Sequence, residues 1–464
     1  MPNVFASLAL VLWPAVCVLI FVRLPPARAL IAGILIGYLF LPPAPAGFDF
    51  PLIPTLDKDS ISALAALIGC LAVCRGRIGF WPESRLARVL MALFVLSPVL
   101  TVLTNTDTIN FGRVWLPGMR IHDLLGLVAQ QVLVLVPFVL ARSLLKDADD
   151  LRDLLAGFVL AGLVYSLPML LEVRLSPQLN IWVYGFFQHS FDQMIRFGGY
   201  RPIVFLYHGL WVAFFMVTAV LATVGLARAA TGRRAMALWA AAIYLLLVLV
   251  LCKSAAAILY AMALAPVIAL FGQRLQLNVA LVLAVLAVSY PLMKGVGLVP
   301  EKTLLSLAER VDEDRADSLK FRFANENALL DRARERPMFG WGSWGRNQIY
   351  DPETGRQISV TDGEWIIAIG VFGWIGFLAE FGLLALPVLL LWRQGMAGAP
   401  PACAGALALM LAVNLVDMLP NATLTPLTWL VAGAILGHTE RAGRIARRAI
   451  WQGRAQPEPL RTIL

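Results

Sequence analysis

Long apolar runs separated by short polar links dominate the sequence. Most runs hold about 17 to 25 residues, the length that an α-helix needs to cross a hydrocarbon core of about 30 Å. Their apolar residues do not alternate with polar ones, as they would in the strands of a membrane barrel. The pattern therefore predicts thirteen helical spans, give or take one. They lie at residues 4–22, 28–41, 60–74, 87–103, 123–141, 153–171, 202–226, 235–252, 255–271, 276–293, 371–392, 402–419 and 425–438.

The links between these runs differ in charge in an alternating way. Arginine-bearing links fall on every second boundary, near residues 23–28, 75–88, 142–152, 228–234, 274 and 392–394. Short cytoplasmic loops are enriched in Lys and Arg, so this side is expected to be cytoplasmic. The arginine-rich segment 441–461 agrees and places the C-terminus inside. Thirteen spans put the N-terminus outside, whereas twelve would put it inside.

The opposite side receives the longer links, at 42–59, 104–122, 172–201 and 294–370. The sequence thus divides into a helical transmembrane region with short loops (1–293), a large, partly helical periplasmic loop (294–370), C-terminal spans (371–438) and a basic cytoplasmic tail (439–464). The predicted fold is all-α, a polytopic transmembrane helix bundle of 12 to 14 spans. We expect functional residues in the long outer links.

Composition strengthens this picture and excludes other classes. Apolar residues make up 59% of the 464 residues and charged residues 14%, whereas about a quarter of a soluble protein is charged. The net charge of +9 does not indicate a nucleic-acid partner, because the basic residues lie mainly in links and the tail. The five cysteines lie in or beside apolar runs without paired spacing, which predicts neither a disulfide framework nor a metal site.

Several polar residues of the outer links have anion-binding chemistry. Arg196 and Arg201 flank a double glycine, and guanidinium groups match phosphate in a bidentate way. The alternative role for both is anchoring at the membrane interface. His208 lies one turn into the expected span 202–226, where it either bonds to a neighbouring helix or serves the site. Lys253, between two spans, is either a snorkelling anchor or part of an anion site.

The large loop adds two further arginines to the candidates. Arg315 and Arg322 are seven residues apart in a helical pattern, so they share nearly one helix face. Nearby carboxylates could simply pair with them. Pro337 is expected to end that helix, and a turn rich in glycine and tryptophan follows.

Three features in a fixed order resemble the O-antigen ligase and O-antigen polymerase family. They are an arginine that precedes a helix ending in a Pro-x-x-Gly-x-Gly turn, a polar position that follows, and a Gly-rich span after it. The matching segments are Phe321-Arg322-Phe323, Arg336-Pro337-Met338-Phe339-Gly340-Trp341-Gly342, Asp362-Gly363-Glu364-Trp365 and residues 370–377. Segment 196–209 and Lys253-Ser254-Ala255-Ala256 are similar to further family features. The resemblance covers roughly residues 150–395.

The resemblance implies a glycosyltransferase in the bacterial inner membrane. Such enzymes move a glycan from an undecaprenyl diphosphate carrier to an acceptor glycan or lipid at the periplasmic side, without nucleotide sugar, metal or cofactor. Arg322 would act on the leaving diphosphate, assisted by Arg196, Arg201, His208, Lys253 and Arg315 as substrate-binding residues. Asp362 stands where family ligases have a histidine base, so Asp362 or Glu364 would take the acceptor proton. Export and chain-length-control proteins are expected partners.

Two readings compete with these roles. Asp362 could be only the N-cap of the helix that follows. At the level of the whole protein, the alternative is a transporter or flippase for an anionic or lipid-linked substrate. A transporter would place ionisable residues near the middle of its spans, whereas most of them here lie in outer links or at span ends.

Overall fold

A computed structural model describes residues 1–74, 78–196, 198–310, 313–398 and 400–451. These residues form helices joined by links of very different length, with three small two-stranded antiparallel hairpins, β1–β2, β3–β4 and β5–β6. The helices are α1 (Val4–Arg23), α2 (Pro26–Phe40), α3 (Lys58–Val73), α4 (Arg85–Leu103), α5 (Ile121–Leu144), α6 (Ala148–Leu175), α7 (Leu179–Tyr184), α8 (Gly209–Ala229), α9 (Gly232–Leu251), α10 (Ala255–Leu270), α11 (Gln273–Gly295), α12 (Glu301–Glu309), α13 (Glu313–Arg334), α14 (Glu364–Ala397), α15 (Ala404–Asp417) and α16 (Pro426–Trp451). The strands are β1 (Phe48–Phe50), β2 (Ile53–Leu56), β3 (Ile109–Phe111), β4 (Val114–Leu116), β5 (Ile195–Arg196) and β6 (Gly199–Tyr200), and a 3₁₀ turn covers Phe191–Met194.

Each predicted span contains one of these helices. Eight of them are long and apolar enough to cross a membrane: α1, α4, α5, α6, α8, α9, α11 and α14. Helices α2, α10 and α15 are apolar but shorter, and α3 and α16 occupy the remaining two runs. The fold is therefore an all-α polytopic helix bundle, which confirms the predicted fold class.

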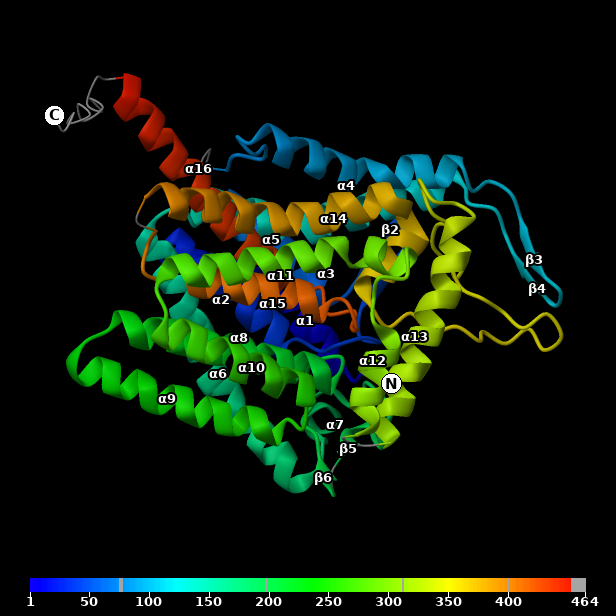
Figure 1. The fold of residues 1–464 in the computed structure, drawn as a ribbon, viewed down its shortest axis with the longest axis horizontal. Coiled ribbons are helices and arrows are strands. Elements are labelled where there is room, and N and C mark those ends of the chain that lie inside the picture. Colours follow the sequence, from blue (N-terminus) through cyan, green and yellow to red (C-terminus); the bar gives the residue numbers. More distant parts are fainter. Residues whose placement is uncertain (75–77, 197, 311–312, 399, 452–464) are drawn as a thin grey trace.

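The bundle has two ends that carry different segments (Figure 1). One end, which we call the loop pole, carries α7, α12, α13 and the β3–β4 and β5–β6 hairpins, and the N-terminus lies there. The other end, the basic pole, carries the arginine-bearing links and the end of α16. Ion pairs join its links, for example Arg142 to Glu440 at 2.7 Å. The helices of the predicted spans alternate in direction between the poles, so each pole collects every second link between these spans.

The start of the expected span 202–226 differs from the prediction, because α8 begins only at Gly209. Residues 203–206 are buried and not helical. Polar side chains from other elements take the place of helical hydrogen bonds. The carboxylate of Glu172 accepts from the amides of Ile203 at 2.8 Å and Val204 at 2.7 Å. Because proline has no N–H, Pro202 also favours a break at this point.

Other backbone groups of this segment also bond to side chains, while the Leu206 amide donates to the Ile203 carbonyl. The hydroxyl of Tyr165 accepts from the Phe205 amide at 3.1 Å, and the ammonium of Lys58 donates to the Phe205 carbonyl at 2.7 Å. Gln188 donates to the carbonyls of Val204 and Leu206 at 2.9 and 3.1 Å. Lys58 is fully buried. The segment is thus a fixed, non-helical piece of backbone inside the bundle, which neither polarity nor periodicity of residues 202–208 indicates.

Helix α14 also differs from the predicted span 371–392. It starts seven residues earlier and contains a kink at Gly373, where φ is +68°. The kink receives the turn that follows α13, because the amide of Trp341 donates to the carbonyl of Gly370 and the amide of Trp374 donates to that of Pro337, both at 2.8 Å. A Cβ on Gly373 would come within 2.4 Å of the Met338 backbone. The large loop therefore docks on α14 through a contact that needs glycine.

We expect Gly373→Ala to lower the free energy of unfolding by about 1 to 3 kcal/mol, because alanine adds both strain at positive φ and a backbone clash. Thermal unfolding of the purified protein in detergent measures the change. Gly126→Ala in α5 is the matched control, since apart from the backbone of its own helix no described atom lies within 4 Å of the added carbon, and alanine favours the helix by up to about 1 kcal/mol. Equal effects of the two substitutions would refute the docking account.

Candidate functional site

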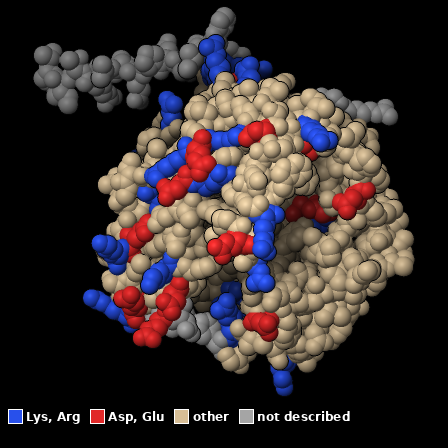
Figure 2. Space-filling view, turned by 90° about the vertical axis from the view of Figure 1, so that its right-hand side faces the viewer, with Lys and Arg blue, Asp and Glu red and all other residues tan. Residues whose placement is uncertain are grey.

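The loop pole contains an open cavity with a volume of about 670 Å³, which we call the cationic cavity. Figure 2 shows this face of the molecule, with Lys and Arg side chains bordering a hollow. Five segments line the cavity: the β5–β6 region up to α8, the α9–α10 junction, α13, the residues before α14, and the turn between α15 and α16. Its described ionisable lining residues are His189, Arg196, Arg201, His208, Lys253, Arg322 and Asp362.

Arg196 and Arg201 come from the hairpin before α8. Arg196 is exposed at the end of β5. Arg201 is only 5% exposed, and its Nε donates to the carbonyl of Cys252 at 3.3 Å. Burial, with Arg196 nearby, lowers the pKa of Arg201 to about 10, so the guanidinium remains charged at neutral pH. Two cations of one hairpin thus face the same cavity.

Lys253 joins this pair from the α9–α10 junction. Its backbone has a φ of +53°, and its ammonium donates to the carbonyl of Arg196 at 2.8 Å. A Cβ on Gly199 would come within 2.4 Å of the ammonium nitrogen. Glycine at 199 therefore makes room for the lysine, which explains one half of the double glycine.

His208 is the N-cap of α8, with its Nδ1 accepting from the amide of Leu210 at 3.0 Å. Its Nε2 lies 3.3 Å from the side-chain oxygen of Gln193, and its ring is 4.5 Å from that of His189. Burial first, then His189 and the nearby arginines, lower the pKa of His208 to about 3. The ring is therefore neutral with its proton on Nε2, so it can donate to a substrate oxygen but has no free nitrogen to act as a base.

Arg322 and Asp362 meet on the other side of the cavity. Arg322 projects from α13, its Nε lies 3.7 Å from Oδ2 of Asp362, and one terminal nitrogen donates to the carbonyl of Pro420 at 3.1 Å. The two side chains are 32% and 35% exposed. The N-cap of α14 is Gly363, not Asp362. The capping alternative for Asp362 is therefore wrong, and its carboxylate is free to face the cavity.

Two candidates are not placed in the cationic cavity. Glu364, the first residue of α14, lines a separate cavity of about 200 Å³ with Asp57, Asp59 and Gln130. For Arg315, only the backbone of α13 is described, and its side chain lies outside the described residues. The structure thus brings together Arg196, Arg201, His208, Lys253, Arg322 and Asp362 from segments far apart in the chain.

One wall of the cavity escaped sequence reasoning. The turn after α15 contributes Pro420, Asn421, Ala422 and Thr423. The sequence does show that polar residues, Asp417, Asn421 and Thr423, separate two apolar runs at this point. A turn between spans commonly contains such residues, so nothing in the local pattern distinguished this one.

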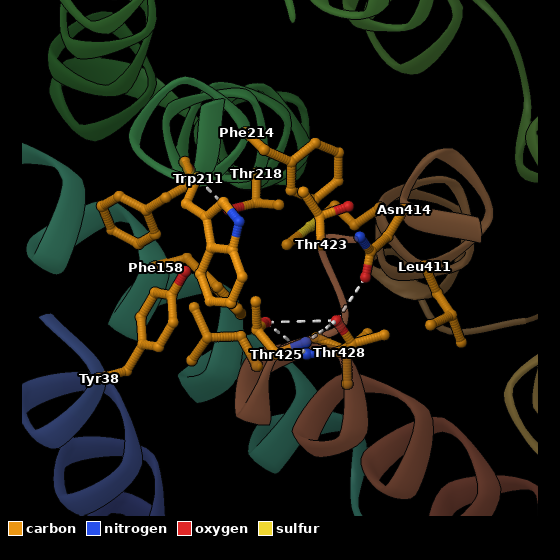
Figure 3. Close-up of a pocket in the computed structure, with 14 residues that line it drawn as sticks. Tyr38, Phe158, Trp211, Phe214, Thr218, Leu411, Asn414, Thr423, Thr425 and Thr428 are labelled. Atoms are coloured by element: carbon orange, nitrogen blue, oxygen red, sulfur yellow. Dashed lines mark hydrogen bonds between the residues drawn. The ribbon is translucent and has the colours of Figure 1, made fainter. Parts of the chain in front are cut away.

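A second cavity lies directly behind this wall, and Trp211 and Thr423 line both (Figure 3). In this cavity Thr428 donates to the side-chain oxygen of Asn414, whose amide nitrogen has no described partner. Its free space of about 30 Å³ is too small for a sugar or a lipid chain. The cationic cavity is therefore the better candidate for substrate binding.

Comparison with known proteins does not assign this chain to a family. The sequence matches no protein-family model, and a search of curated proteins found no matching relative. Within the described residues no group of three or more His, Cys, Asp or Glu side chains is arranged to hold a metal ion. What the cavity offers is four cations, one carboxylate and two histidines, of which His208 is neutral, a set suited to a substrate with two or more negative charges.

Proposed function

We propose that the protein is a membrane glycosyltransferase that polymerises or ligates oligosaccharide units carried on undecaprenyl diphosphate, during synthesis of a surface polysaccharide. The observation that carries the proposal is the cationic cavity, which three arginines and a lysine from three segments line together with one carboxylate. A diphosphate matches this charge distribution. The resemblance of segments 321–342 and 362–377 to the O-antigen ligase and polymerase family supports the same function.

The chemistry follows from where the charges lie. The acceptor hydroxyl oxygen attacks the anomeric carbon, and the bond from that carbon to the diphosphate oxygen breaks. The bonding electrons leave with the diphosphate, whose growing negative charge Arg322, Arg196, Arg201 and Lys253 stabilise. Asp362 takes the acceptor proton as the base. His208, a donor through Nε2, holds a phosphate or sugar oxygen.

The pairing of Asp362 with Arg322 suits this sequence of events. At 3.7 Å the two groups partly neutralise each other before substrate enters. A bound diphosphate competes for Arg322, because a guanidinium fork binds phosphate oxygens in a bidentate way. The carboxylate is then released towards the acceptor hydroxyl, so donor binding prepares the base.

A transporter remains the second candidate, and one observation favours it. Glu380 lies in the middle of α14, is only 6% exposed, and one of its side-chain oxygens has no described partner. Ionisable residues at membrane depth are often part of a transport pathway. Glu380 does not line the cationic cavity, so the two functions depend on different residues and can be separated by mutation.

The site should face the periplasm of a bacterial inner membrane, because arginine-bearing links collect at the opposite pole. We expect a membrane-impermeant maleimide to label Thr354→Cys, on the loop pole, in cells with an intact inner membrane. Thr231→Cys, equally exposed at the basic pole, should react only after that membrane is opened. The five native cysteines are buried, which keeps background labelling low. The reverse pattern would place the cavity in the cytoplasm.

For the chemistry, we expect purified protein in detergent to form glycosidic product from a lipid-linked oligosaccharide, and Asp362→Asn to reduce the rate by about 10²- to 10⁴-fold, because an amide cannot accept the proton. Arg322→Lys should cost about 10²- to 10³-fold, since a point charge does not reproduce the fork. The assay follows radiolabelled product.

Arg334→Lys is the matched control on the same helix. Arg334 pairs with Asp331 at 2.6 Å and is 55% exposed, so its replacement should leave the rate nearly unchanged. Detergent solution has no two compartments, so product formation there also separates an enzyme from a transporter. Full activity of Asp362→Asn would remove the base assignment, and absence of any product from the wild type, with Glu380→Gln abolishing substrate uptake into vesicles, would favour transport.

A further inference from the structure

Asp417, the last residue of α15, is a carboxylate buried at 4% exposure. Its two oxygens accept hydrogen bonds from uncharged side chains. Oδ1 accepts from the amide nitrogen of Asn421 at 3.0 Å, and Oδ2 accepts from the hydroxyl of Thr423 at 2.8 Å. Burying a carboxylate costs free energy unless it is well hydrogen-bonded, so these two bonds hold the turn between α15 and α16 in one shape.

The carbonyls of this turn bind the side chain of Arg322 and the backbone just after Asp362. The carbonyl of Pro420 accepts from Arg322 at 3.1 Å. The carbonyls of Met418 and Asn421 accept from the amide of Glu364 at 2.9 and 3.3 Å, two residues after Asp362. The turn therefore connects α13 to the start of α14.

Packing makes this connection tight. A Cβ on Gly363, the residue next to Asp362, would come within 2.0 Å of the Leu419 carbonyl oxygen. The side chains of Asn421 and Thr423, the two donors to Asp417, also line the cationic cavity. A change in the shape of the turn would thus shift the cavity wall, Arg322 and the Asp362 backbone together.

We propose that Asp417 is a positioning residue of the site: without touching substrate, it fixes the α15–α16 turn and through it the separation of Arg322 and Asp362. The structural part of this role stands on the contacts alone. Its catalytic consequence rests on the proposed function. Asp417 is distinct in role from Arg196, Arg201 and Lys253, which bind from the opposite wall.

Two substitutions separate the hydrogen bonds of Asp417 from its charge. Asp417→Leu keeps the branched shape of the side chain at a larger volume and leaves the Asn421 amide and Thr423 hydroxyl unpartnered. Asp417→Asn retains most of the network, because its oxygen can accept from Asn421 and its amide can donate to the Thr423 hydroxyl. Asp417→Asn should therefore keep the turn and the rate of glycosyl transfer close to wild type. A role of the charge itself would instead make both variants equally defective. Glu440→Gln, a change of a buried carboxylate at the basic pole, controls for general destabilisation.

The first measurement is hydrogen–deuterium exchange in lipid nanodiscs. We expect amides 418–425 and 363–366 to exchange roughly tenfold faster in Asp417→Leu, because two hydrogen bonds that close the turn are lost. Asp417→Asn should lie close to wild type, and Glu440→Gln should change exchange only near the basic pole. Unchanged exchange of 418–425 in Asp417→Leu would overturn the positioning role whatever the protein does.

The second measurement is glycosyl transfer. In Asp417→Leu, kcat should fall by about 10²-fold, as expected for misplaced catalytic groups. KM for the lipid-linked donor should change little, because Arg196, Arg201 and Lys253 are untouched, and Asp417→Asn should restore most of kcat. Faster exchange with normal kcat would overturn the inference. Faster exchange in a protein whose wild type forms no product would instead overturn the proposed function and leave the structural role intact.

Discussion

Hydrocarbon offers no partners for backbone hydrogen bonds, and this constraint explains how the site is built. Non-helical backbone within a bundle of spans is tolerated only where other parts of the protein satisfy its N–H and C=O groups. Buried side chains, chiefly Glu172 and Lys58, satisfy the backbone of residues 203–206. The turn 418–425 bonds through its carbonyls to the Glu364 amide and to Arg322, and Asp417 fixes its shape through the side chains of Asn421 and Thr423. Both pieces form or support walls of the cationic cavity. Glu172, Lys58 and Asp417 thus hold non-helical segments of the bundle in place.

The same constraint sets where the cations of the cavity stand. Segment 203–206 fixes the chain between Arg201 and His208, so both residues are held at fixed positions in the cavity wall. The opposite turn holds Arg322 through the Pro420 carbonyl. Four cations repel each other, and the one carboxylate of the cavity cannot neutralise them all. The hydrogen bonds to the surrounding backbone must therefore hold these side chains in place. An anionic group bound in this cavity would be attracted by all four cations at once.

Local sequence patterns were sufficient to predict the helices but not the arrangement of the candidate site. Apolar runs of span length identify the helices because that signal lies within each run. Residues 202–208 are as apolar as a span, and their departure from helix depends on Lys58 and Glu172, which lie far away in sequence. Glu364 and Asp362 are two positions apart, yet they line different cavities because Gly363 packs against the α15–α16 turn. The convergence of Arg196, Arg201 and Arg322 was expected only through the family resemblance, since no periodicity relates segments more than a hundred residues apart.

The central claim is that the cationic cavity binds the diphosphate of a lipid-linked donor. A cryo-electron microscopy structure of the protein in nanodiscs with undecaprenyl diphosphate tests it most directly. Our account predicts diphosphate density between the side chains of Arg196, Arg201, Lys253 and Arg322, with Asp362 moved away from Arg322. Diphosphate density at any other place on the protein, with the Arg322–Asp362 pair intact, would contradict it.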